Sequence, residues 1–201
     1  MKNKHLFSFL LFAALLNVIT LHSFSYSFYG TAANAAFINE EEKQSLEYMT
    51  EEEKLARDYA ELMGEKHNSE FFNKIAEGKQ SDLDKIKDVM SSKNVEDPVK
   101  NDEAGIFKSE TFKDLYSRLS EEGSQNINNA LKGGAEIAEL QIKDLDKYLT
   151  VVTDSDIKNN FTELKKASEK NLKSYVGQLS QRGYGYFPKH LTSDDFNKIL
   201  N

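Results

Sequence analysis

The chain has 201 residues, a formal net charge of −7 and no cysteine. The lack of cysteine excludes disulfides, thiolate metal sites and a cysteine nucleophile, and an acidic surface does not favour nucleic acid as a partner. With 39% hydrophobic residues, 29% charged residues and only 2 prolines, the composition is typical of one helical globular domain.

The N-terminal residues have the features of a secretory signal peptide. Two lysines precede an apolar run over residues 6–21, and small residues at 33–35 suit a signal peptidase. Because the run is shorter than the roughly 20 residues that span a bilayer, removal is favoured over the alternative, an uncleaved anchor. We expect a signal peptide at 1–35 and a mature domain at 36–201, exported to the periplasm, the cell envelope or the exterior, with no transmembrane segment.

The first two long helices are predicted from apolar residues that recur at intervals of three and four. The first helix, 40–66, follows a capping box made by Asn39 and Glu42. The second helix, 70–91, begins after Ser69 and becomes irregular near its end. Both helices are long enough to bury a continuous apolar stripe.

A long connection follows the second helix. It is charged and contains Pro98 and Gly105, which favours a loop up to residue 109. A short helix with apolar residues at 112, 115 and 119 comes next, and we expect it to end at Gly123.

Two further long helices are predicted at 124–150 and 156–182. Ser155 is the expected N-cap of the second of these, and Gly183 should end it. A last turn of helix is expected after Ser193.

Loop lengths predict how these helices are connected in space. The first and last pairs of long helices are joined by a few residues, so each pair should be antiparallel. The connection of about 30 residues between the second and third helices can recross a helix of roughly 35 Å, so these two helices should be parallel. The predicted fold is therefore an all-α four-helix bundle with one long crossover and short accessory helices.

Each long helix carries polar residues near its middle, where its apolar stripe predicts core. These residues are Glu53, Lys79, Asp82, Glu139, Ser168 and Asn171. Buried charge is costly unless it is paired or bound to a metal, so polar positions at one level in all four helices indicate an internal cluster or site. The neighbouring charges at 51 and 52 are interpreted as part of a solvated helix face.

Three segments resemble a known family. The run from Glu51 to Asp58, the run from Gly134 to Glu139, and the tail Tyr186-Phe187-Pro188 are similar to the ferritin-like domain-of-unknown-function family 2202. The resemblance covers roughly residues 37–201. It implies a ferritin-like four-helix bundle of the rubrerythrin type.

The resemblance also implies where metal ligands would lie. Ferritin-like di-metal proteins take one glutamate from each of two helices and a Glu-x-x-His pair from each of the others. Glu53 and Glu139 match the lone glutamates. The paired positions instead hold Lys79, Asp82, Ser168 and Asn171, so the di-metal site is degenerate.

Two functional interpretations follow. In the first, Lys79 neutralises nearby carboxylates in a salt-bridge cluster, and the exported protein is a non-catalytic binding or structural protein with a partner in the envelope and no cofactor. In the alternative, a metal-binding oxidoreductase that uses iron or manganese keeps a single divalent metal on Glu53, Asp82 and Glu139. Such an all-oxygen set would prefer Mn, Mg or Ca to iron. The cation at Lys79 favours the first interpretation over an enzyme.

Overall fold

The computed structural model describes residues 38–201, so the predicted signal peptide lies outside the described residues. Within residues 38–201 the chain forms helices and no strand. The helices are α1 (Glu40–His67), α2 (Glu70–Ser92), α3 (Glu110–Gln125), α4 (Ile127–Leu149), α5 (Ser155–Gln181) and α6 (Ser193–Leu200). None of them is both long and apolar enough to cross a membrane. The predicted all-α class and four long helices are confirmed.

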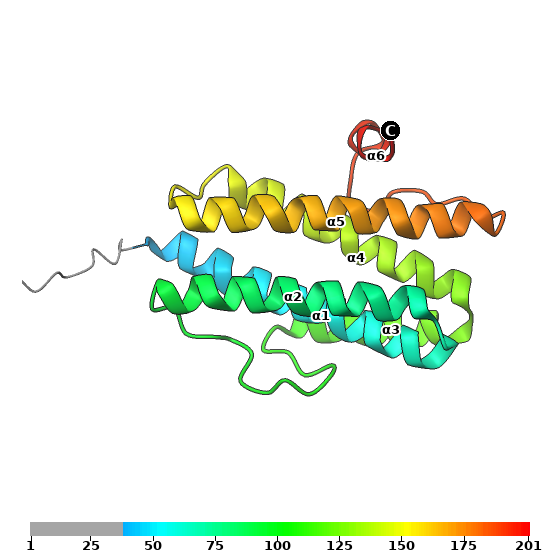
Figure 1. The fold of residues 1–201 in the computed structure, drawn as a ribbon, viewed down its shortest axis with the longest axis horizontal. Coiled ribbons are helices and arrows are strands. Elements are labelled where there is room, and N and C mark those ends of the chain that lie inside the picture. Colours follow the sequence, from blue (N-terminus) through cyan, green and yellow to red (C-terminus); the bar gives the residue numbers. More distant parts are fainter. Residues whose placement is uncertain (1–37) are drawn as a thin grey trace, which may run out of the picture. The chain divides into compact units, whose positions relative to one another are not determined.

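The four long helices have the predicted order (Figure 1). Helix α2 runs back along α1, and α5 runs back along α4, while α2 and α4 point in the same direction. The crossover between α2 and α4 consists of a loop and α3, which packs on α1 and α4. Helix α1 is thereby enclosed by α2, α3, α4 and the crossover loop.

At the ends of α1 and α5, two of the predicted capping features are confirmed and one is wrong. The capping box is present, since the backbone N–H of Glu42 donates to Asn39 Oδ1 at 2.9 Å and that of Asn39 donates to Glu42 Oε2 at 3.0 Å. The predicted N-cap Ser155 is instead the first helical residue of α5. Asp154 is the cap, because its carboxylate accepts the N–H groups of the first turn. Gly183 follows the end of α5 with a φ of +81°, as its role as a stop requires.

Gly123 does not end the short helix as predicted. It lies inside α3 and is buried, and a β-carbon there would come within 2.6 Å of the Tyr59 hydroxyl and 2.7 Å of the Met63 sulfur. Close packing against α1 therefore explains this glycine. The chain turns at Asn126, which caps α4.

The prediction that the charges at 51 and 52 belong to a solvated face is wrong. Glu51 is 6% exposed and Glu52 is fully buried. The charged residues that follow in α1 are buried as well: Lys54, Arg57 and Asp58. The cause is the position of α1, which has neighbours on every side in the middle of its length.

Candidate functional site

A closed ring of hydrogen bonds joins all four long helices in the bundle interior. Lys79 Nζ on α2 lies 3.1 Å from Glu53 Oε2 on α1 and donates to Ser168 Oγ on α5 at 3.3 Å. Ser168 Oγ donates to Gln141 Oε1 on α4 at 3.1 Å, and Gln141 Nε2 donates to Glu53 Oε1 at 2.9 Å, which closes the ring. Each side chain is at most 2% exposed. The predicted ion pair between Lys79 and a carboxylate is confirmed.

Electrostatics in the ring are set by burial and by the lysine. Burial raises the pKa of the Glu53 carboxyl to about 7, although the Lys79 charge opposes this rise. The Asp82 charge raises the pKa of Glu53 further. Asp82 itself lies at the margin, 9% exposed, with Oδ2 4.0 Å from Lys79 Nζ. Glu53 and Asp82 thus share the Lys79 ammonium group, and Asp82 Oδ1 also lies 3.6 Å from Lys85 Nζ.

Glu139 lies elsewhere, in a second cluster that holds the C-terminal tail. Its Oε2 accepts the backbone N–H groups of Lys189, His190 and Leu191 at 2.9, 2.8 and 3.0 Å, and its Oε1 accepts the Tyr186 hydroxyl. The structure therefore separates Glu139 from Glu53 and Asp82. A carboxylate that binds three consecutive amides is an anchor for the chain.

Gln141 is the ring residue on α4 that sequence reasoning missed. It follows Glu139 by two positions, which is about 200° of helix rotation, so the two side chains leave α4 on opposite sides. Because α4 packs against α1, α3 and α5, both sides are buried. The signal that could have identified Gln141 is its position next to Ile142, an apolar residue that is buried in α4.

Asn171, the remaining predicted residue, is half-buried beside a small cavity next to Lys79. The cavity has a volume of about 10 Å³ and is also lined by Tyr59 and Tyr175. A volume of about 10–15 Å³ holds one water molecule. The bundle interior therefore has no chamber for an organic substrate around Lys79.

The donor set does not fit a di-metal centre. Within residues 38–201 no three histidine, aspartate or glutamate side chains are grouped so that they could hold a metal ion. Both Glu53 oxygens accept hydrogen bonds. The Lys79 ammonium group lies near both Glu53 and Asp82, where it would repel a divalent cation.

Glu52 is a further buried carboxyl that sequence reasoning missed. It is fully buried, and neither oxygen has a hydrogen-bond partner among the described residues. Burial raises its pKa well above the usual range, the charges of Asp144 and Glu53 raise it further, and Lys79 opposes the rise. Folding thus favours the protonated form of the Glu52 carboxyl.

Three further buried charges of α1, those of Lys54, Arg57 and Asp58, hold the crossover loop. Lys54 Nζ pairs with Asp58 and donates to the Glu103 carbonyl at 2.8 Å. Arg57 Nη2 lies 2.7 Å from Asp58 Oδ1 and 2.8 Å from Asp102 Oδ1. The charged residues in the run from Glu51 to Asp58 therefore have a mainly structural role.

Comparison with known proteins places these features in a family. An uncharacterized protein of Methanocaldococcus jannaschii, MJ0754, is 37% identical over 164 residues, which are 82% of this chain and 89% of the relative. The crystal structure of that hypothetical protein matches with a TM-score of 0.79 over 81% of this chain and 93% of the solved one. The family model described as an uncharacterized protein domain, DUF2202, matches residues 42–201. The chain therefore belongs to the DUF2202 family.

Proposed function

We propose that this protein is an exported, non-catalytic member of the ferritin-like class that works as a binding or structural protein of the periplasm, envelope or exterior. The observation that carries the proposal is the position of Lys79, whose ammonium group lies between Glu53 and Ser168 at the centre of the four helices. Ferritin-like di-metal proteins place their ions between side chains that face inward from four helices. The space between the four long helices of this chain holds the Lys79 ammonium group instead, which supports the proposal.

Two features of the interior support a role outside catalysis. The cavity beside Lys79 holds about 10 Å³, which is too small for an organic substrate. The ring also satisfies its own hydrogen-bonding groups, so it needs no ligand to complete it. The partner is then expected to contact the outer surface of the bundle.

Metal content tests this proposal directly. Protein purified without chelators should contain far less than one equivalent of iron or manganese, measured by inductively coupled plasma mass spectrometry. One equivalent of either metal per chain, retained through gel filtration, would overturn the proposal in favour of the metal-binding oxidoreductase.

A gain-of-function variant sharpens the test. Lys79→Glu with Asp82→His restores a Glu-x-x-His pair on α2 and should increase Mn²⁺ affinity in calorimetric titration, because it replaces a cation by two ligands. The matched control is Lys74→Glu with Asp88→His, which makes the same charge change at two exposed positions of α2. Equal gains in both proteins would show that surface charge alone attracts the metal.

Export is tested on protein recovered from cells that produce the full chain. Mass spectrometry should find an N-terminus at or near Ala36, in agreement with the small residues before it. An intact chain in the membrane fraction would support the uncleaved anchor instead. Intact protein in the cytoplasm would reject export.

A further inference from the structure

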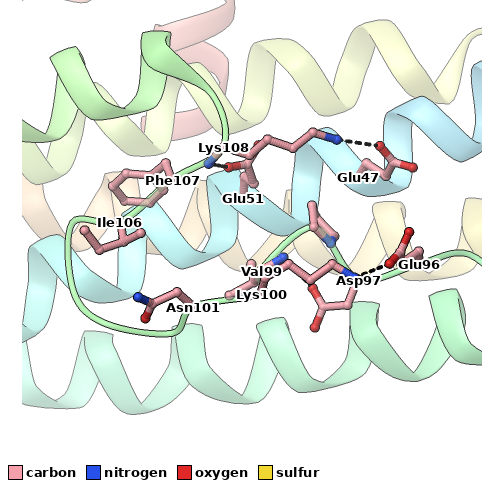
Figure 2. A pocket seen from close by; sticks show the side chains of 11 residues that line it. Glu47, Glu51, Glu96, Asp97, Val99, Lys100, Asn101, Ile106, Phe107 and Lys108 are labelled. Atoms are coloured by element: carbon pink, nitrogen blue, oxygen red, sulfur yellow. Dashed lines mark hydrogen bonds and ion pairs between the residues drawn. The ribbon is translucent and has the colours of Figure 1, made fainter.

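A hollow outside the ring and the tail cluster lies between α1 and the crossover loop (Figure 2). Its volume is about 370 Å³, within the usual range of small-molecule sites. Its apolar walls are Pro98, Val99, Ile106 and Phe107. A second hollow of about 330 Å³ shares Glu51 and Pro98 with it, so Glu51 borders both.

The hollow is preformed because buried ionic contacts hold the loop in an arch. Asp102 is fixed by Arg57, the Glu103 carbonyl accepts Lys54 Nζ at 2.8 Å, and the Gly105 N–H donates to Asp58 at 3.0 Å. Gly105 makes the turn with a φ of +79°. A site that is already open needs little ordering when a ligand enters.

The polar lining carries more negative than positive charge. Its charged members are Glu47, Glu51, Glu96, Asp97, Lys100 and Lys108. Lysine side chains pair with each carboxylate except Glu51. Within the described part of the chain, Glu51 has no cationic side-chain partner, although it is only 6% exposed.

Backbone N–H groups offset the negative charge of the Glu51 carboxylate only in part. Its Oε1 accepts the N–H groups of Lys108 and Ser109 at 2.5 and 3.1 Å, at the start of α3. The beginning of a helix contributes roughly half a positive charge. The second carboxylate oxygen has no hydrogen bond to the described residues, so the hollow combines apolar walls with one under-compensated carboxylate.

We propose that this hollow binds a small organic cation, namely a primary ammonium group on a compact apolar body. The ammonium group pairs with Glu51, and the apolar body packs against Val99 and Phe107. The proposal rests on the proposed function in that the cation is a ligand rather than a substrate. Its outcome is separate from metal content, because Glu51 is not part of the interior ring.

The test titrates the purified protein with phenethylammonium and follows its ¹⁵N-labelled amides by NMR. We expect saturable shifts at Val99, Ile106 and Lys108, and affinity at least about tenfold higher than for 2-phenylethanol or 3-phenylpropionate, which lack the positive charge. Glu51→Gln keeps an oxygen for the two amides and should lower the affinity about tenfold. Glu163→Gln, at an exposed position on α5, removes the same charge elsewhere and should leave the affinity unchanged.

A second variant keeps the proposal testable if Glu51→Gln does not fold. Val99→Trp fills the hollow from the loop and should abolish the saturable shifts. Equal binding of the amine, the alcohol and the acid would overturn the proposal, as would an absence of saturable shifts. A metal-free protein that fails this titration rejects the site while leaving the proposed function intact.

Discussion

Lys79 and Glu53 form an ion pair in which both side chains are buried. Lys79 Nζ lies 3.1 Å from Glu53 Oε2 and 3.4 Å from Oε1, and the side chains are 2% and 0% exposed. An exposed pair of this kind contributes little to stability, but a buried charge that loses its partner is strongly destabilising. The ring should therefore respond sharply to the loss of either charge.

Lys79→Ala should lower the free energy of unfolding by about 3–5 kcal/mol, because it leaves Glu53 buried without its cation. Urea denaturation at pH 7 measures the change. The control Lys85→Ala removes a lysine of α2 that is 52% exposed and should change stability by less than about 0.5 kcal/mol. Similar losses in both variants would contradict a buried ion pair.

Glu52 should make the protein less stable as the pH rises. Its pKa is raised in the folded state, so the folded protein binds this proton more tightly than the unfolded chain does. The unfolding free energy must then fall with increasing pH from the unfolded pKa, about 4.3, up to the folded value. The cost of burying this acid is thus greatest at neutral and alkaline pH.

Glu52→Met removes the acid and keeps a side chain of similar length. It should raise the free energy of unfolding at pH 8 by on the order of 1–3 kcal/mol, and the gain should shrink towards pH 4. Glu65→Met, at an exposed position of α1, is the control and should show no such pH-dependent gain. A loss of stability at every pH would indicate that Glu52 has a partner after all.

Glu139 should control the order of the C-terminal tail. Glu139→Ala removes the acceptor of the N–H groups at residues 189–191, so their hydrogen exchange should accelerate at least about tenfold. Exchange in α2 should remain near its original rate. Unchanged protection at 189–191 would mean that other contacts hold the tail.

Periodicity and loop length were enough to predict the helices and their order. Apolar residues at intervals of three and four set the helical spans, and the two short links left only one arrangement for the long crossover. The capping box at Asn39 and the stop at Gly183 followed from local chemistry. These features depend on residues close together in the sequence, which is why they could be predicted.

The site was predicted only in part, because tertiary packing decides which neighbour each side chain of a helix meets. Glu53, Lys79 and Ser168 lie on helices with one clear apolar stripe, and the structure brings them together. Helix α4 is buried on more than one side, so its apolar stripe did not distinguish Glu139, which meets the tail, from Gln141, which meets the ring. The buried charges of α1 were missed for a related reason, since the loop that covers them comes some 45 residues later in the chain.

The crossover loop should depend on Arg57. This side chain is 5% exposed and joins Asp58, which is fully buried, to Asp102 on the loop, where its charge and hydrogen bond hold the pKa of the Asp102 carboxyl below the usual range. Arg57→Ala should lower the free energy of unfolding by about 1–3 kcal/mol. The loss should be smaller than if Arg57 were the sole cation beside Asp58, because Lys54 still pairs with Asp58.

The loop itself provides the more specific measurement. Without the arginine, the segment around Asp102 loses its tie to α1, so trypsin should cleave the native protein after Lys100 several times faster than in the original chain. Arg182→Ala, at an exposed position after α5, is the matched control and should leave that cleavage unchanged. A resistant loop in Arg57→Ala would show that the contacts of Lys54 and Gly105 suffice to hold the arch, and the hollow would then remain open without Arg57.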